Sequence, residues 1–150
     1  MKTITKQEAL KRSAELEKEL QELKAIIDAP IHIMGRVKTL EDAIKILGGV
    51  SENVKMLLDY NGNDADVLAS QAHLKLTLIA RALNEGWYPD WNDDDEYKWV
   101  PVFTDSELVY FDADYWNANT HVGSRLCFKS EELAKYAATQ FADIYSAFLK

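Results

Sequence analysis

The stretch Trp87-Tyr-Pro-Asp-Trp-Asn-Asp-Asp-Asp-Glu-Tyr-Lys-Trp99 opens the segment around which this 150-residue chain is organised. The segment runs from Gly86 to Ser130 and contains every tryptophan of the chain. Between Gly86 and Trp116 a single base, Lys98, accompanies nine acids, a net charge of −8 that equals the formal charge of the whole protein. The acids are Asp90, Asp93, Asp94, Asp95, Glu96, Asp105, Glu107, Asp112 and Asp114. The negative charge is therefore concentrated in one segment.

The composition bounds the class of protein. With 47% hydrophobic residues the chain can bury one core, and a pI near 4.9 argues against direct binding of nucleic acid or an anionic membrane, which both need a positive surface. A basic protein remains a suitable partner. The single cysteine, Cys127, and the lack of an apolar leader or of about 20 consecutive apolar residues predict a soluble protein of a reducing, cytoplasmic compartment.

The N-terminal region predicts a long helix over residues 6–28, begun by a capping box between Thr5 and Glu8. Its apolar residues recur at three and four positions, as in the seam of a coiled coil. These residues are Leu16, Leu20, Leu23 and Ile27, preceded by Ser13. Two interpretations stay open: the helix packs across its own domain, or it self-associates through residues 6–28.

Further helices are expected on either side of the acidic segment. Amphipathic patterns predict short helices at Leu40–Leu47 and after Ser51, and a longer one from Asp64 or Asp66 to about Glu85. Ser130 is a suitable N-cap for one final helix that reaches Leu149.

Between these helices the pattern becomes β-rich and predicts three strands, Tyr97–Phe103, Leu108–Asp112 and Arg125–Lys129. The expected fold is α+β: an N-terminal helical arm, residues 1–29, and a domain of residues 30–150. In that domain, helices pack on a small three-stranded antiparallel sheet that the C-terminal helix closes.

Four motifs carry a resemblance to a known family: Ala82-Leu-Asn-Glu-Gly-Trp87, Pro89-Asp-Trp91, Tyr97-Lys-Trp99 and Val122-Gly-Ser-Arg-Leu-Cys-Phe-Lys-Ser130. From about Arg36 to the C-terminus the chain resembles small hypothetical proteins encoded by phages and mobile elements of gut Bacteroides-type bacteria. That family has no assigned activity. The resemblance implies a phage or mobile-element protein made in a bacterial cytoplasm, and no catalytic residue is carried over.

A divalent-metal site is one candidate within the acidic segment. Asp90, Asn92 and Asp94 alternate as the first ligands of a calcium loop do, which raises Ca²⁺ or Mg²⁺ as a cofactor. The pattern then departs from that loop, because Asp95 stands at the glycine position and Pro101 at the position of the final glutamate. A solvated acidic turn is the alternative.

Other reactive side chains give weaker signals. Cys127 lies six residues after His121, but no signature of a cysteine nucleophile surrounds it, and packing within a strand is the alternative. Arg125 is expected to pair with Asp112 or Asp114 across the sheet.

The aromatic residues divide into strand residues, which suit a core, and loop residues, which suit an interface. The loops Tyr88–Glu96 and Asp112–His121 are expected to form an acidic aromatic face toward a basic partner. Its candidate residues are Tyr88, Trp91, Asp93, Asp94, Asp95, Glu96, Asp112, Asp114, Tyr115, Trp116 and Arg125.

These observations favour a non-enzymatic accessory protein that binds a basic host or phage protein. A small metal-dependent enzyme or ligand-binding protein is the first alternative. A structural component that assembles through the N-terminal helix is the second.

Overall fold

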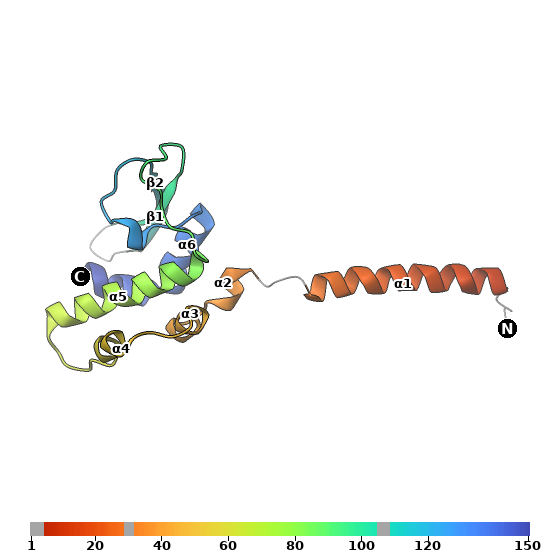
Figure 1. The fold of residues 1–150 in the computed structure, drawn as a ribbon, viewed down its shortest axis with the longest axis horizontal. Helices are drawn as coiled ribbons and strands as arrows, with labels where there is room; N and C mark the ends of the chain where they lie inside the picture. Colours follow the sequence, from red (N-terminus) through yellow and green to blue (C-terminus); the bar gives the residue numbers. More distant parts are fainter. Residues whose placement is uncertain (1–4, 29–31, 105–108) are drawn as a thin grey trace. The chain divides into compact units, whose positions relative to one another are not determined.

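The computed structural model describes residues 5–28, 32–104 and 109–150, and the chain divides into two units, Met1–His32 and Ile33–Lys150 (Figure 1). Outside these residues lie Pro30, which follows the predicted N-terminal helix, the acids Asp105 and Glu107, and the predicted strand start at Leu108. Within them the fold is α+β. None of the described helices is both long and apolar enough to cross a membrane.

The first unit contains α1, Lys6–Asp28, which is the predicted N-terminal helix. Its capping box is formed: Thr5 Oγ1 accepts a hydrogen bond from the Glu8 backbone N–H at 3.3 Å, and Glu8 Oε2 accepts one from the Thr5 N–H at 2.9 Å. Hydrogen bonds from Thr5 also lower the pKa of Glu8.

The second unit begins with three short helices: α2 (Ile33–Arg36), which was not predicted, α3 (Leu40–Ile46) and α4 (Glu52–Leu58). Thr39 caps α3 with a complete capping box, and Ser51 caps α4. The two predicted helix starts, at Leu40 and after Ser51, are therefore confirmed.

The helix α5 (Ala65–Leu83) is the longest described in the second unit. The Asp64 carboxylate starts it by accepting from the N–H groups of Asp66 and Val67 at 3.0 and 3.1 Å. After it, Glu85 and Gly86 both have positive φ, 51° and 87°, so the chain turns away at the predicted place.

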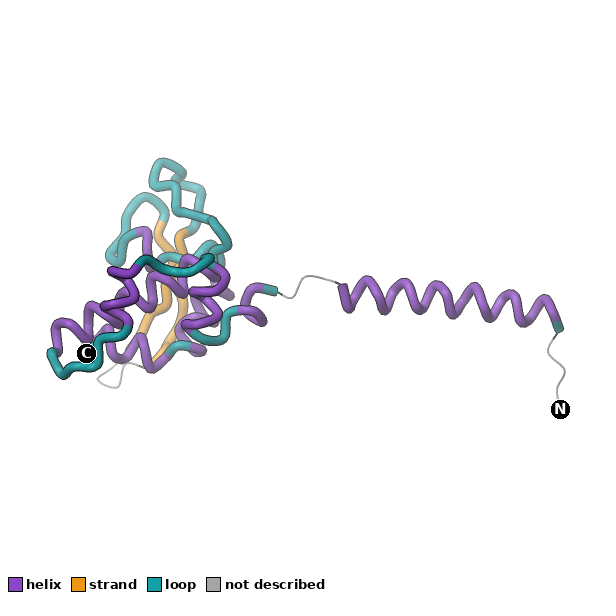
Figure 2. The backbone as a smooth tube through the Cα atoms, turned by 60° about the horizontal axis from the view of Figure 1, so that its bottom comes forward, coloured by secondary structure: helices purple, strands orange, loops and turns teal. Residues whose placement is uncertain are grey.

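Two antiparallel strands follow, β1 (Lys98–Thr104) and β2 (Val109–Trp116). They lie side by side in Figure 2, with loops at one end. Trp99 pairs with Tyr115 and Pro101 with Ala113, and the register shifts between Val102 and Phe103. The second strand continues beyond the predicted end at Asp112 to Trp116, so part of the expected loop is strand.

The predicted third strand, Arg125–Lys129, is wrong. Residues Ser124–Leu126 form the 3-10 turn η1, and only Phe128 pairs with β1, through two hydrogen bonds to the Trp99 backbone at 2.8 and 3.0 Å. The Asn84 side chain uses the neighbouring peptide groups: its Nδ2 donates to Cys127 O at 2.9 Å, and its Oδ1 accepts from Lys129 N at 3.0 Å. The sheet described is therefore two-stranded.

The predicted single C-terminal helix is in fact two, α6 (Glu131–Gln140) and α7 (Ala142–Leu149). Phe141 separates them with a non-helical backbone, φ −117° and ψ 31°, while its ring is buried in the core. Ser130 caps α6, as predicted, by accepting from Leu133 N at 3.3 Å.

The core of the second unit lies where α5 meets α7, α3 and η1, and α6 covers both strands. Tyr136 of α6 donates its hydroxyl to Val37 O at 2.8 Å, which fastens α6 to the segment before α3. The largest fully buried apolar side chains are Phe128, Leu76, Ile79, Leu83, Leu133, Val37 and Cys127. The charged side chain of Lys98 is buried as completely as these.

Candidate functional site

Lys98 holds the acidic loop together from inside. It is the first residue of β1 and its side chain is 0% exposed. Its ammonium donates to Asp93 O at 2.7 Å and to Glu96 O at 2.9 Å, and lies 3.4 Å from Glu96 Oε1. Because a buried ammonium is stable only when its donors are satisfied, the loop must close around it.

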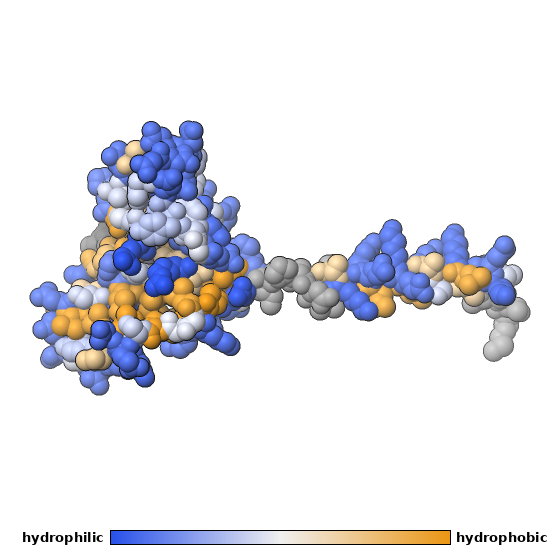
Figure 3. Space-filling view, in the orientation of Figure 1, coloured by the Kyte–Doolittle hydropathy of each residue, from blue (hydrophilic) through white to orange (hydrophobic). Residues whose placement is uncertain are grey.

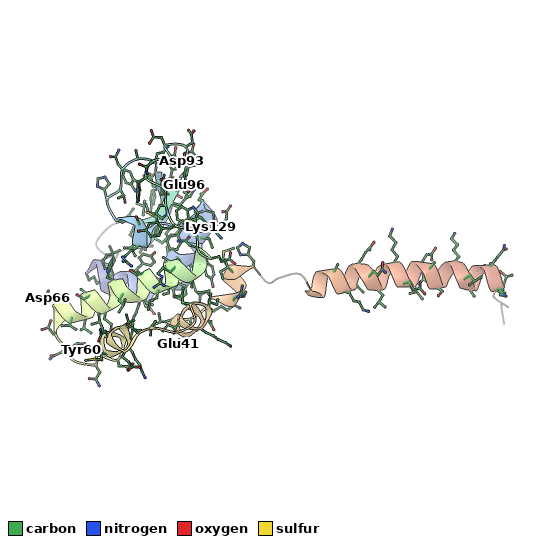
Figure 4. All side chains as sticks on the ribbon, viewed as in Figure 1. Glu41, Tyr60, Asp66, Asp93, Glu96 and Lys129 are labelled. Atoms are coloured by element: carbon green, nitrogen blue, oxygen red, sulfur yellow. The ribbon has the colours of Figure 1, made fainter. Side chains whose placement is uncertain are left out.

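Glu96 closes the same loop from its other end. Its carboxylate accepts from Trp87 Nε1 at 3.0 Å and from the Asp90 backbone N–H at 2.8 Å. Figure 4 shows Glu96 and Asp93 on this loop, beyond the strands. Glu96 is thus committed to the structure of the loop, although the sequence placed it among the residues of the interface.

Trp91 is also an internal contact. Its indole Nε1 donates to Ser124 Oγ at 2.7 Å, and the Lys98 ammonium lies 5.4 Å from the centre of its ring, within the range of a cation–π interaction. The ring is half-buried. Trp91 therefore fastens the acidic loop to η1, a role that its position among acids in the sequence did not indicate.

The outer part of the loop is exposed. Asp93, Asp94 and Asp95 all lie at the surface, and Tyr88 is 69% exposed. The Asp95 N–H donates to Asp93 Oδ1 at 2.9 Å, a local turn that leaves the carboxylates in solvent. In Figure 3 mostly hydrophilic residues cover this end of the second unit, whereas apolar residues gather along α5.

The second group of predicted residues lies on β2. The Tyr115 ring lies 4.3 Å from that of Tyr97 and 5.2 Å from that of Trp99, and it is 43% exposed. Trp116 is half-buried, and its ring lies 4.5 Å from that of His121. Tyr115 thus contributes exposed aromatic surface, and Trp116 mainly packs.

Asp112 and Asp114 lie at the open edge of β2. The N–H and C=O groups of Trp99 bond to Phe128, so they do not bond to Tyr115, the residue opposite on β2. In an antiparallel pair the N–H and C=O groups of Tyr115 then also point away from β1, and those of Ala113, two residues earlier, point the same way. The Asp112 carboxylate accepts from Ala113 N and that of Asp114 from Tyr115 N, each at 2.8 Å. The two acids therefore bind the N–H groups of Ala113 and Tyr115, which could otherwise pair with the strand of another molecule.

One hydrogen bond joins the two regions. Asn117, just after β2, donates its Nδ2 to Asp94 O at 2.6 Å. With the stacking of Tyr97 on Tyr115, this contact places the acidic loop beside the end of β2. The exposed acids and tyrosines of the predicted face are Tyr88, Asp93, Asp94, Asp95, Asp112, Asp114 and Tyr115.

Arg125 lies elsewhere than expected. Lys135, at 3.9 Å, is the cation that approaches Asp112, and in the described part of the chain Arg125 pairs with neither Asp112 nor Asp114. Arg125 instead lines a cleft of about 140 Å³ with Arg81. The other lining residues are Asn84, Trp87, Tyr88 and Ser124. No local pattern pointed to Arg81, because the two arginines are far apart in the chain.

Asp90 and Asn92, two of the candidate metal ligands, hydrogen-bond to each other. Asp90 Oδ1 accepts from the backbone N–H of Asn92 at 2.9 Å and from its Nδ2 at 3.2 Å, so this acid is used in a local turn. Among residues 5–28, 32–104 and 109–150, no group of three or more His, Cys, Asp or Glu side chains is placed to hold a metal ion.

Cys127 is buried, and its Sγ lies 3.2 Å from Gly123 O. Burial raises the pKa of the thiol to about 11, against the opposing effects of Thr120 and Lys98. The group is therefore a neutral thiol near pH 7, which is a poor nucleophile. Its role in this structure is packing.

Comparisons with protein-family models, with curated proteins and with solved structures find no match for this chain. The geometry of the loop and strand residues is therefore the basis for any functional assignment.

Proposed function

We propose that this protein is a non-enzymatic accessory protein of a phage or mobile element, which acts in the bacterial cytoplasm by binding a basic host or phage protein. The binding face consists of Tyr88, Asp93, Asp94, Asp95 and Tyr115. We call these five residues the acidic face.

The burial of Lys98 is the observation that carries the proposal. Lys98 is the only base between Gly86 and Trp116, and its ammonium is fully used inside the loop. The exposed carboxylates of Asp93, Asp94 and Asp95 have no ion pair with another described residue. An uncompensated group of like charges on a fixed loop attracts a partner of opposite charge and speeds its association.

The exposed aromatic residues supply the apolar part of such an interface. Tyr88 and Tyr115 are 69% and 43% exposed, and tyrosine is among the residues that contribute most to binding energy at protein interfaces. Tyr115 lies on β2, paired with β1, so less backbone entropy is lost when it binds.

Charge neutralisation tests the acidic face. The variant Asp93→Asn/Asp94→Asn/Asp95→Asn removes three charges, and the amide introduced at position 93 keeps an acceptor oxygen for the Asp95 N–H. The control, Glu41→Gln/Glu52→Gln/Asp59→Asn, removes three exposed charges on and just after α3 and α4. Figure 4 shows that Glu41 lies far from Asp93.

Each immobilised variant is used to capture proteins from a bacterial lysate, and the captured proteins are quantified at low and at high salt. We expect the wild type and the control to retain the same basic proteins, and the variant changed at residues 93–95 to lose them. We expect high salt to release them from the wild type. Equal capture by all three proteins would refute the charge argument.

The aromatic contribution needs a separate variant, because alanine at Trp91 would break the contact with Ser124 and destabilise the fold. Tyr88→Ala removes an exposed ring whose hydroxyl makes no hydrogen bond to another described residue. We expect about tenfold weaker capture with an unchanged unfolding curve. Unchanged capture would remove Tyr88 from the acidic face.

A further inference from the structure

The helix α1 carries an apolar stripe that no described residue of its own unit covers. Leu16, Leu20 and Leu23 are 49%, 52% and 57% exposed, and α1 is the only helix or strand among the described residues of Met1–His32. A single helix of 23 residues gains little stability in water without a partner. The stripe is therefore a surface that needs an occupant.

The stripe follows the seven-residue repeat of a coiled coil. With Leu16 and Leu23 at position d, Leu20 and Ile27 fall at position a. Leucine at d and a β-branched residue at a, as at Ile27, are the combination that favours two strands. Ala9 and Ser13 continue the d and a positions toward the N-terminus with small side chains.

The charged residues beside the stripe indicate which occupant fits. Arg12 and Glu19 stand at position g, and Glu17 and Lys24 at position e. In a parallel pair of helices a residue at g faces the residue at e five positions later in the partner. Two copies of α1 would then join Arg12 to Glu17 and Glu19 to Lys24, and both pairs have opposite charge.

An antiparallel pair makes fewer attractive contacts. It sets e against e and g against g, and it has two registers that align the stripe. The register that places Leu16 against Leu20 brings Glu17 against Glu17 and Glu19 against Glu19 of the second copy, and like charges in contact oppose association. The register that places Leu16 against Ile27 joins Glu17 to Lys24 but leaves Glu19 without a cation. The charge pattern therefore favours the parallel arrangement, in which Glu19 also has a partner.

The side chains concerned are largely free to make these contacts. The ion pairs that the described part of α1 makes are Arg12–Glu15 at 3.3 Å and Lys18–Glu22 at 4.0 Å, so Glu17, Glu19 and Lys24 are uncommitted. Arg12 meets Glu15 through one nitrogen, and its guanidinium has further donors for a second carboxylate.

We propose that residues 6–28 form a parallel two-stranded coiled coil with the same segment of a second copy of this chain. The dimer does not depend on the acidic face, because none of the residues in the coiled coil belongs to it. If both hold, the dimer presents two acidic faces to one partner assembly, and binding gains avidity without any new contact.

Sedimentation equilibrium of the full chain at low salt measures the association. We expect a monomer–dimer equilibrium that Glu19→Lys weakens about tenfold, because it replaces both Glu19–Lys24 pairs of the dimer by repulsive ones. The double variant Glu19→Lys/Lys24→Glu restores opposite charges and should restore the dimer. Glu22→Lys makes the same charge change at position c, outside the contact, and should leave the dimer intact.

Orientation is tested by a disulfide in a Cys127→Ala background. Cysteine at Ala9 should form a dimer disulfide under mild oxidation, because position 9 faces position 9 in the parallel arrangement only. Two mixtures test the antiparallel registers. A disulfide between Ile27→Cys and Ala9→Cys chains would indicate the register that places Leu16 against Leu20, and one between Ile27→Cys and Leu16→Cys chains the register that places Leu16 against Ile27. Either disulfide, formed only on mixing, would overturn the parallel orientation. A monomer at every concentration, a trimer, or failure of the double charge variant to restore association would overturn the parallel dimer itself.

Discussion

Lys98 sets the shape of the acidic loop, because its buried ammonium binds two backbone carbonyl oxygens and one carboxylate. A lysine in such a place is sustained by hydrogen bonds from all of its donors. Removing it leaves the carbonyl groups of Asp93 and Glu96 without their partner.

The variant Lys98→Met tests this role. We expect it to lower the free energy of unfolding by about 3 kcal/mol, because buried acceptors lose their donor. Lys135→Met, which removes an exposed lysine that pairs with Glu131 and Asp112, should cost less than about 1 kcal/mol. Urea denaturation followed by tryptophan fluorescence measures both. Equal losses would show that Lys98 is no more important than a surface lysine.

Cys127 gives the protein a pH dependence at high pH. Burial raises the pKa of its thiol from 9.0 to about 11. Below pH 9 both the folded and the unfolded thiol are protonated, so the group has no effect on stability. Above pH 9 the unfolded thiol ionises first, and unfolding releases a proton.

Stability should therefore fall between pH 9 and pH 11 by at most about 2 kcal/mol on account of this thiol. Burial also raises the pKa of Tyr145, so part of the decline will remain in Cys127→Ala. The check is the free energy of unfolding of wild type and Cys127→Ala over a series from about pH 8 to about pH 11. Parallel curves for the two proteins would contradict the raised pKa.

At the scale of elements, helices were easier to predict than strands. The stripes and caps of α3, α4 and α5 are local features, and Thr39, Ser51 and Asp64 made their starts visible in the sequence. The break at Phe141 could not be predicted from the sequence, because no glycine or proline marks it.

The prediction of a third strand failed for a reason that is absent from the local sequence pattern. Its peptide groups are bound by Asn84, a residue far earlier in the chain. The candidate site shows the same division between local and distant causes. The exposure of its acids and tyrosines follows from local composition. The internal roles of Trp91, Glu96 and Lys98 depend on contacts such as that between Trp91 and Ser124.

Asn84→Asp tests whether the Asn84 side chain takes the place of a neighbouring strand for the peptide groups of Cys127 and Lys129. The carboxylate can still accept from Lys129 N, but it has no donor for Cys127 O and carries a charge into a buried position. We expect a loss of about 2 to 3 kcal/mol in the free energy of unfolding near neutral pH, with part of it recovered at about pH 4, where the side chain can be protonated. A loss that is the same at both pH values would argue against a buried charge.

The edge of β2 gives a second prediction at this scale. Asp112→Ala/Asp114→Ala removes the acceptors for the Ala113 and Tyr115 N–H groups, so we expect aggregation at lower protein concentration. Asp112→Asn/Asp114→Asn removes the same charges but keeps an acceptor oxygen at each position, and should remain closer to wild type. Light scattering over a concentration series distinguishes them. Equal aggregation of the two variants would assign the protection to charge alone.

At the scale of the whole molecule, the two units differ in what stabilises them. Every described residue of the buried hydrophobic cluster lies in Ile33–Lys150. The second unit should therefore fold without the first.

A protein that begins at Ile33 should unfold at the same urea concentration as the full chain and sediment as a monomer where the full chain is a dimer. Circular dichroism and sedimentation test these two outcomes. A lower unfolding midpoint for the shortened protein would mean that α1 stabilises the second unit.

The way in which Lys98 holds its loop has a consequence for how this protein can change. The lysine binds the carbonyl oxygens of residues 93 and 96, groups that every amino acid possesses, so the loop conformation depends little on which side chains stand at positions 94 and 95. Those positions can be diversified as in a binding-loop library, while Lys98, Glu96 and Trp91 remain constant. One scaffold could in this way acquire a new recognition specificity, in evolution or by design, without refolding.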